Sequence, residues 1–299
     1  MDRSVMRGVC LAFVAYFAYA LSDASVKLLE GGIHPLQSAF FGGVFGIAAI
    51  PFLLSPGERW HYAFRSRNRR MWVLRAIAAV TGALGSITAF TYLSMAEAFS
   101  LLFLMPAFVT VMSVVFLKED VGWRRWTAVI LGFVGVLIVL RPGFRELNIG
   151  HAGAVVGGFS GAMTIVLMRA MGGKERRISL YGAGLVGLIL VSGVLMVPYF
   201  RWPSIEQWIW LAGYGLLAAV GNALVMMASA RAPATLVAPP QYSQMLWAII
   251  LGYFVFGDRL DWPMAVGVAL IIASGLITFV REKVRAPAVA EAAPLIHPQ

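Results

Sequence analysis

The chain has 299 residues, of which 60% are hydrophobic and 13% are charged, and its mean hydropathy is +0.80. Soluble domains are about 45–50% apolar and about 25% charged, so this composition excludes a water-soluble globular protein and equally a disordered chain. The net charge of +10 comes from Lys and Arg spread over many loops, with no nucleic-acid-binding motif around them. A lipid bilayer is therefore the expected partner, and nucleic acid is not.

Ten long apolar runs follow one another along the chain, and a membrane-spanning helix needs about 20 such residues. In chain order the runs cover residues 8–29, 36–54, 72–92, 99–117, 126–140, 152–171, 180–200, 208–228, 236–256 and 264–280. They are unbroken rather than alternating, which favours helices over barrel strands. The predicted fold class is an all-α integral membrane protein with ten transmembrane helices. Residues 286–299, rich in Ala and Pro, are predicted to form a disordered cytoplasmic tail.

Lys and Arg accumulate in alternate loops, which predicts the orientation of the chain. If the N-terminus is inside, the outer loops hold Arg141, Arg145, Arg201 and Arg259, and most other basic residues lie on the inner side. Because cytoplasmic loops retain positive charge, both termini are predicted to be cytoplasmic, in a plasma or inner membrane. The single cysteine, Cys10, excludes an internal disulfide and a cysteine-based metal site.

The second half of the chain repeats the pattern of the first half. One constant offset pairs acidic, Trp and Leu positions of the two halves: Glu119 with Asp258, Trp123 with Trp262, and Leu137 with Leu276. Residues 1–142 and 143–285 are therefore predicted to be two repeats of five helices each. Because five is odd, the second repeat is inverted in the membrane. Inverted repeats are typical of secondary transporters, whose binding site lies near the midplane between the halves.

The segment Ala234–Arg281, which reads ATLVAPPQYSQMLWAIILGYFVFGDRLDWPMAVGVALIIASGLITFVR, resembles the last two helices of EamA-type carriers in the drug/metabolite transporter superfamily. The first half has a looser copy, with Leu117-Lys118-Glu119 at the turn. The opening helix, with Ser22-Asp23-Ala24-Ser25-Val26-Lys27, also looks like that of the family. The resemblance implies a ten-helix carrier of small metabolites with a central cavity. Size and layout are most similar to exporters of amino acids, including aromatic ones, and of other metabolites.

Polar and aromatic residues at helical spacing mark surfaces that face protein or water rather than lipid. They occur on the first, third, fourth, sixth, eighth and ninth runs, which we expect to surround the cavity while the other four buttress it. The residues predicted to line the cavity are Tyr16, Tyr19, Asp23, Lys27, Tyr92, Phe103, Asn222, Met226, Tyr242, Gln244 and Trp247. The amides of Asn222 and Gln244 need hydrogen-bond partners that lipid does not supply, and they are suited to the polar end of an amino acid.

Asp23 and Lys27 are opposite charges spaced i, i+4 within one run, in the favourable order. We expect them to neutralise each other near the outer end of the helix; a pair that senses substrate or protons is the alternative. With Asp23 paired, no lone carboxylate remains at mid-membrane. This favours gradient-driven export over tight proton antiport.

Two further groups of residues suggest bends and close helix contacts. Pro106, Pro239 and Pro240 free backbone carbonyls early in or inside their helices, and we expect bends there, either hinges or static kinks. Gly157 and Gly161 have the spacing that permits close helix packing.

The leading hypothesis is a secondary transporter that exports amino acids or related small metabolites by alternating access. Export of cationic drugs is the alternative within that class, and a channel remains open outside it. A membrane enzyme is disfavoured because the four histidines, His34, His61, His151 and His297, are expected in loops or the tail. No catalytic residue, metal site or cofactor is predicted. The protein is expected to function as a monomer, with a dimer left open.

Overall fold

In the computed structural model, the described residues are 3–29, 31–54, 57–119, 121–141, 146–171, 175–232, 234–237 and 239–291, without the side chains of 124, 125, 169, 177, 234, 235, 239 and 278–291. All regular structure in these ranges is helical. In chain order the helices are α1 (Arg3–Lys27), α2 (Pro35–Gly46), η1 (Ile47–Ala49), α3 (Ile50–Leu53), η2 (Trp60–Phe64), α4 (Arg69–Tyr92), α5 (Met95–Leu102), α6 (Met105–Leu117), α7 (Trp123–Leu140), α8 (Ile149–Met171), α9 (Arg177–Gly187), η3 (Leu188–Ser192), α10 (Gly193–Leu195), η4 (Val197–Tyr199), α11 (Ile205–Ser229), α12 (Ala234–Val237), η5 (Pro239–Tyr242), α13 (Ser243–Phe256) and α14 (Trp262–Glu291).

Every predicted apolar run coincides with helical structure, but not every run forms one long helix. Seven stretches of the described chain are long and apolar enough to cross a membrane, and the helices at Trp126–Leu140 and Trp262–Ile277 are shorter. The run 236–256 is divided among α12, η5 and α13. The count of ten spans therefore stays a prediction. Of the predicted tail, residues up to Glu291 belong to α14, and 292–299 lie outside the described residues.

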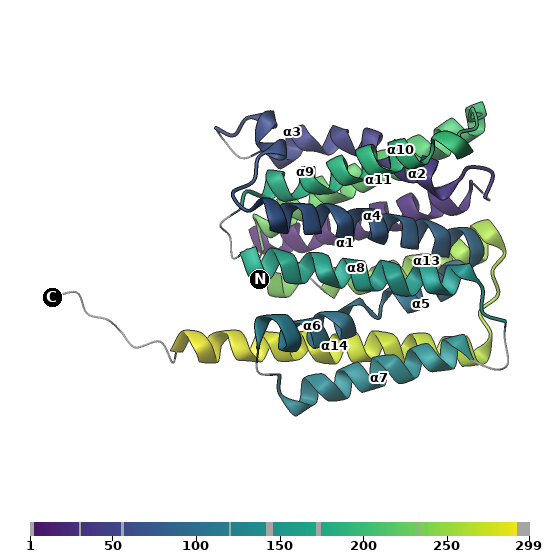
Figure 1. The fold of residues 1–299 in the computed structure, drawn as a ribbon. Coiled ribbons are helices and arrows are strands. Elements are labelled where there is room, and N and C mark those ends of the chain that lie inside the picture. The colour runs from purple at the N-terminus through teal and green to yellow at the C-terminus, as the bar shows by residue number, and fades with distance from the viewer. Residues whose placement is uncertain are drawn as a thin grey trace.

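The helices lie side by side, and the start of α1 and the end of α14 are at the same end of the bundle (Figure 1). α1 packs along α11, and α4 packs along α8 and α9. α2 contacts α11 and η3, which joins these helices into one body. α7 and α14 pack together at the opposite side, and α5, α6 and α13 connect them to α8 and α1.

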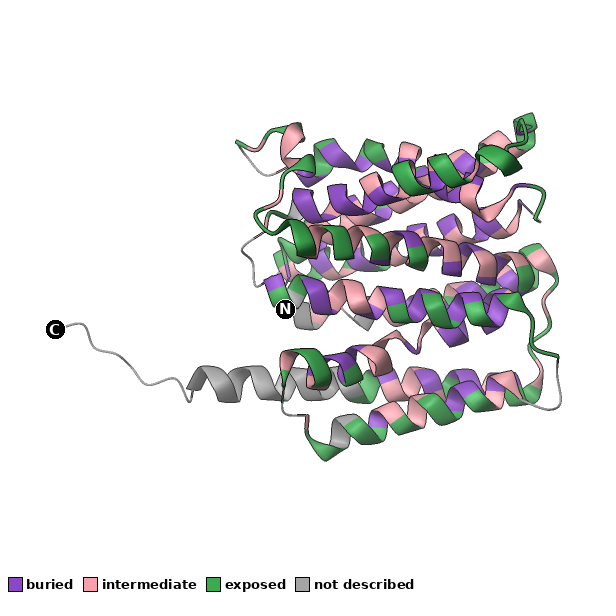
Figure 2. Cartoon of the chain, in the orientation of Figure 1, coloured by how far each residue is buried: buried purple, intermediate pink, exposed green. Residues whose placement is uncertain are grey.

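Many of the residues buried between the helices are small, and many large apolar residues are exposed; Figure 2 shows where buried and exposed residues lie along the helices. Ala12, Ala15 and Ala20 of α1 have no accessible surface, whereas the exposed fraction is 79% for Phe254 and 71% for Val194. A water-soluble protein would bury such side chains. The arrangement is the one expected of a protein whose surface faces hydrocarbon.

Glycines permit a close backbone contact between the two halves of the chain, where α4 crosses α8. A Cβ atom on Gly85 would lie 2.5 Å from the carbonyl oxygen of Gly153 and 2.7 Å from the backbone nitrogen of Gly157. One turn away, the hydroxyls of Thr81 and Ser160 are hydrogen-bonded at 2.8 Å. Backbones this close gain dispersion contacts, which drive helix association where the hydrophobic effect is absent.

Loops at the end where α1 begins also join the halves. Oε1 of Glu175 accepts hydrogen bonds from the Ser66 hydroxyl at 2.6 Å and from the backbone N–H groups of Arg67 and Asn68 at 2.6 and 2.9 Å. Partial burial alone would raise the pKa of Glu175, but these hydrogen bonds and the charge of Arg67 lower it below its usual value. The carboxylate thus binds at the N-terminus of α4, where the helix dipole favours negative charge.

We predict that Gly85→Ala destabilises the protein strongly, because the added methyl group meets backbone atoms that cannot rotate away. The cost of overpacking is about 1–3 kcal/mol and should appear as a lower thermal unfolding midpoint in detergent. Gly184→Ala in α9 is the matched control, because its Cβ would meet nothing closer than 3.4 Å. Equal midpoints for the two variants would contradict the packing described here.

Candidate functional site

A cluster of tyrosines and one carboxylate lies inside the bundle between α1 and α11. The rings of Tyr16 and Tyr19 are 5.9 Å apart, and Tyr19 packs against the backbone of Gly221. Asp23 lies near Tyr19, one turn earlier on α1, and near Tyr214 of α11. All these polar side chains are surrounded by protein yet keep some accessible surface. The cluster is therefore partly buried inside the bundle, between helices of the two halves.

The expected ion pair between Asp23 and Lys27 does not form. Lys27 Nζ donates instead to the carbonyl oxygen of Leu93 at 2.6 Å, lies 3.9 Å from Oδ2 of Asp258, and is 5.1 Å from the ring centre of Phe256. The prediction considered only the i, i+4 neighbour of Lys27. The fold instead brings Leu93, Phe256 and Asp258 to the end of α1, where they surround the Lys27 ammonium group. Asp23 has no hydrogen bond or ion pair with any other described residue.

Asp258 connects three elements from both halves of the chain. Besides its contact with Lys27, its Oδ2 accepts the backbone N–H of Met95 at 2.9 Å, at the first residue of α5. Asp258 also lines a pocket of about 100 Å³ together with Ser94 and Gly252. The contacts hold the turn before α14 against the end of α1 and the start of α5.

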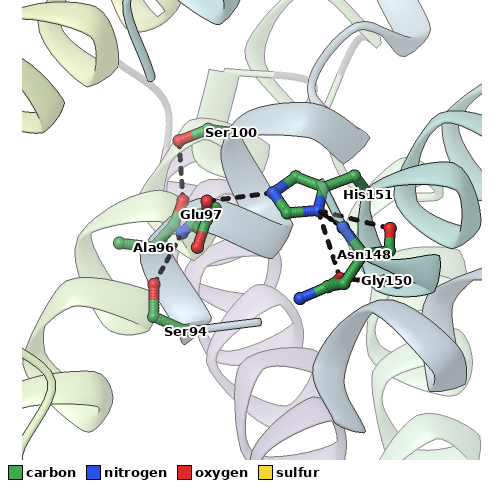
Figure 3. A network of polar contacts seen from close by, with 7 residues as sticks. All are labelled: Ser94, Ala96, Glu97, Ser100, Asn148, Gly150 and His151. Carbon is green, nitrogen blue, oxygen red and sulfur yellow. Dashed lines mark hydrogen bonds and ion pairs between the residues drawn. The ribbon is translucent and has the colours of Figure 1, made fainter. Parts of the chain in front are cut away.

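Glu97 and His151 form a second link between the halves at the same end (Figure 3). The Glu97 Oε1 and His151 Nε2 atoms are 3.2 Å apart, and both side chains are about 10% exposed. Nδ1 of His151 accepts the backbone N–H of Asn148 at 3.0 Å, so Nε2 is the nitrogen that donates to Glu97. His151 was expected in a loop; it lies instead in the first turn of α8, buried against α5.

Two of the predicted hinge positions coincide with interruptions in helices. α5 ends at Leu102 and α6 begins at Met105, with Pro106 next to the break. In the second half, η5 contains Pro239 and Pro240 and is followed directly by α13. The side chain of Pro239 lies outside the described residues. The two breaks face each other, because the rings of Phe103 and Tyr242 are 5.6 Å apart.

The packing glycines lie on α8, beside this break. Cβ atoms on Gly157 and Gly161 would meet Leu102 at 2.7 Å and Met105 at 2.9 Å. The crevice between the two breaks, lined by Phe103, Tyr242 and Ser274 among others, has a volume of about 10 Å³. It has room for about one water molecule and none for a metabolite.

The remaining predicted cavity residues lie in different surroundings. Nδ2 of Asn222 donates to the Ala218 carbonyl of its own helix at 2.8 Å, while Gln244 is half-buried with no partner among the described residues. Met226 is also half-buried. The ring of Trp247 packs at a tilt against that of Phe17 with ring centres 4.5 Å apart, and its buried Nε1–H has no acceptor in the described part of the chain. Tyr92 ends α4, is 56% exposed, and is not brought together with the others.

The cavity prediction omitted two residues, Arg75 and Tyr181. Arg75 of α4 lies beside Gly184 of α9, and its buried Nε has no hydrogen-bond partner among the described residues. Tyr181 donates to the carbonyl of Gly46 at 2.8 Å and interacts with Tyr19. The signal for Arg75 was available, because a charge within an apolar run is rare and usually functional. For Tyr181 no pattern in the sequence points inward.

The side chains brought together can bind an organic molecule by ion pairing, hydrogen bonding and stacking. Within the described ranges, no group of three or more His, Cys, Asp or Glu side chains could hold a metal ion. The arrangement therefore offers polar recognition inside a helical bundle.

Comparisons with known proteins agree with this geometry. The EamA-like transporter family matches the chain twice, over residues 6–141 and 148–280. The chain is 24% identical over 285 residues to an S-adenosylmethionine uptake transporter of Rickettsia prowazekii, covering 94% of this chain and 95% of the relative. It is 25% identical over 274 residues to a riboflavin transporter of Vibrio cholerae, covering 90% and 91%. One crystal structure shares the fold, with a TM-score of 0.62, 15% identity, and 94% and 99% of the two chains covered.

We predict that Lys27→Met and Asp258→Asn each lower the thermal unfolding midpoint, because each leaves a partly buried charge without its partner. Each substitution is expected to cost about 1–3 kcal/mol. The double variant should cost clearly less than the sum of the two, since the partners interact directly. Strictly additive midpoint shifts would show that the contact contributes nothing.

Proposed function

Because this chain belongs to the EamA-like transporter family, we propose that it is a secondary carrier that exports amino acids or related small metabolites across the inner membrane by alternating access. In this proposal ten helices form two inverted repeats around a central cavity. The observation that carries it is the pair of interrupted helices, α5/α6 and η5/α13, which face each other at Phe103 and Tyr242. Interrupted helices meeting between repeats are a hallmark of secondary transporters.

The contacts between helices support the inverted repeat. If α1, α2, α4, α6 and α7 are exchanged for α8, α9, α11, α13 and α14, the contact of α1 with α11 becomes that of α8 with α4. The contact of α2 with α11 becomes that of α9 with α4, and α6 with α8 becomes α13 with α1. All of these contacts occur. A pseudo-twofold axis in the membrane plane would produce this pattern.

Local geometry supports the same axis. α6 and α13 both end in the left-handed conformation, at Lys118 with φ 53° and at Gly257 with φ 65°, which are equivalent positions of the repeat. In both turns the next residue, Glu119 or Asp258, donates its N–H to a carbonyl of the preceding helix, at 3.2 and 2.8 Å.

The contact between α7 and α14 is also symmetric. A Cβ on Gly132 of α7 would lie 2.8 Å from Oγ of Ser274 in α14. The repeat makes Gly132 equivalent to Ile271 and Ser274 equivalent to Gly135, and a Cβ on Gly135 would lie 2.9 Å from Ile271. Ser274 donates to the carbonyl of Ala128 at 2.7 Å, where Gly135 approaches the carbonyl of Gly267. The axis of the proposed repeat would pass between these two helices.

The charge distribution supports the orientation with both termini in the cytoplasm. The loops at the end where α1 begins carry Arg65, Arg67, Arg69 and Arg176, and such loops remain on the inner side. In this orientation the contacts of Lys27 with Asp258 and of Glu97 with His151 close the outer end. Alternating access requires these contacts to break when the cavity opens outward.

The substrate class rests on the cavity walls and on the relatives. Tyrosines, Met226 and Trp247 offer apolar and aromatic surface that tolerates varied substrate side chains, and Gln244 offers an amide without a partner in the described chain. S-adenosylmethionine, named for one relative, is itself an amino-acid derivative. The direction of movement follows the gradient in a carrier of this kind, so the same cavity serves export or uptake.

Export of cationic drugs is the second candidate, and the observation that favours it is the unpaired carboxylate of Asp23. Both candidates are tested by counterflow in proteoliposomes that contain the purified protein, with S-adenosylmethionine, aromatic amino acids, riboflavin and a cationic dye as probes, with and without a pH gradient. We expect saturable counterflow of at least one amino-acid-type probe. A channel gives no counterflow, and its absence for all probes would overturn the proposal.

We predict that Gln244→Leu lowers counterflow about tenfold or more while expression and folding persist, because the substrate loses a hydrogen bond at a site shielded from water. Asn222→Leu should have a smaller effect, since the Asn222 amide already bonds to its own helix. The control is Thr127→Val, because the exposed hydroxyl of Thr127 bonds only to Trp123. Gln207→Leu is unsuitable as a control because Gln207 caps α11. Unchanged transport in Gln244→Leu would remove Gln244 from the site.

A further inference from the structure

Asp23 is a carboxylate held inside the bundle without a protein partner. It lies on the same stripe of α1 as Tyr16 and Tyr19, is surrounded by protein, and keeps a small accessible surface. The nearest basic residue on its own helix, Lys27, is bound to the Leu93 carbonyl and to Asp258. No hydrogen bond or ion pair joins Asp23 to the rest of the described chain.

Packing of α1 does not require this carboxylate. The adjacent Ser22 donates to the carbonyl of Tyr214 at 2.7 Å, and Ser25 donates to the carbonyl of Leu21 at 2.8 Å and packs against Gly213. These two hydroxyls attach the outer part of α1 to α11. Asp23 stands between them in sequence and takes part in neither contact. Its presence is therefore not explained by the fold.

An isolated carboxylate in such a place is costly unless a positive charge or hydrogen-bond donors compensate it. Tyr19 lies one turn before Asp23 on α1. Tyr214 lies beside the adjacent Ser22, which donates to its carbonyl oxygen at 2.7 Å, and both phenol groups are near Asp23. Two phenol groups offer donors and the electron-rich faces of their rings, which attract organic cations. They do not offer the several carboxylate or carbonyl ligands that a bare metal ion needs, and no metal-binding group occurs in the described chain.

We infer that Asp23 binds the positively charged group of the transported molecule, an ammonium or a sulfonium, beside Tyr19 and Tyr214. The inference rests on the proposed function and narrows it to cationic and zwitterionic substrates. Asp23 then determines specificity: it attracts molecules with a positive group and disfavours neutral analogues and anions. Tyr16, one turn further along the stripe, extends the aromatic wall toward the middle of the membrane.

Two pairs of probes distinguish the two sources of positive charge. S-adenosylmethionine and S-adenosylhomocysteine differ in the sulfonium, and an aromatic amino acid methyl ester and its N-acetyl derivative differ in the ammonium. Binding to the purified protein in detergent is measured by the shift in thermal unfolding midpoint, and transport is measured by counterflow. The variants are Asp23→Asn, Asp23→Glu and the control Ser25→Ala, which removes a hydroxyl two residues further along α1.

We expect the wild type to bind the charged member of at least one pair more tightly than its neutral partner. Asp23→Asn should weaken binding of that charged probe about tenfold or more, because one partner of a desolvated charge pair is lost. Asp23→Glu should retain part of the affinity, and Ser25→Ala should retain all of it. The neutral probe should bind equally to the wild type and Asp23→Asn.

Two outcomes would overturn the inference: no preference of the wild type for either charged probe, or equal affinity of the wild type and Asp23→Asn. Binding is read separately from transport, so the two claims are distinguishable. Charge-dependent binding without counterflow would refute the carrier and leave the role of Asp23 standing. Counterflow that is equal in the wild type and Asp23→Asn would support the carrier and refute the role of Asp23. If the ligand-free Asp23→Asn variant has a lower unfolding midpoint than the wild type, Asp23 has a structural role. In that case Asp23→Glu would not restore affinity for the charged probe.

Discussion

A bilayer offers no hydrogen-bonding partner to a polar group in its core, and this constraint governs where each polar side chain of the protein lies. Most intramembrane hydroxyls bond to a backbone carbonyl, as those of Thr88 and Ser100 do to their own helices. Asp23, Gln244 and the Nε atom of Arg75 have no such partner within the described chain. Groups that the fold leaves unpaired, in a solvent that cannot pair them, are the ones that a polar substrate can use.

Contacts between the halves determine how such a cavity could open. Where α4 crosses α8, glycine backbones touch, and a bulky side chain cannot be inserted. At the end of α1 the halves are held instead by single polar contacts, Lys27 with Asp258 and Glu97 with His151. Polar contacts of this kind exchange easily with water, whereas a close-packed crossing does not. The glycine crossing is thus suited to act as a pivot and the polar cluster as a closure, with the two breaks between them as the deformable part.

The sequence predicted what depends on local pattern. Length and hydropathy identified every long helical stretch, and the offset pairing Glu119 with Asp258 identified two turns that share a left-handed cap. The sequence-based prediction failed where a residue's partner lies far away along the chain. Lys27 was paired with its neighbour on the same helix, because nothing local indicates an interaction with Asp258. His151 was placed in a loop, because its burial depends on where α5 lies. Proline positions predicted the helix interruptions. The hydropathy pattern nevertheless treated each interrupted run as one continuous span, although the helices in it are shorter.

In the proposed mechanism the closure at the end of α1 opens during transport, and the accessibility of a cysteine at that end reports on this opening. Ala96 is 4% exposed and lines the pocket beside Asp258, so Ala96→Cys in a Cys10→Ser background reports on that end. A membrane-impermeant maleimide is added to proteoliposomes during counterflow and in its absence. We expect slow labelling at rest and severalfold faster labelling during substrate exchange, and faster labelling also when Lys27→Met is added. Labelling that is equally slow under all conditions, with transport intact, would contradict the account.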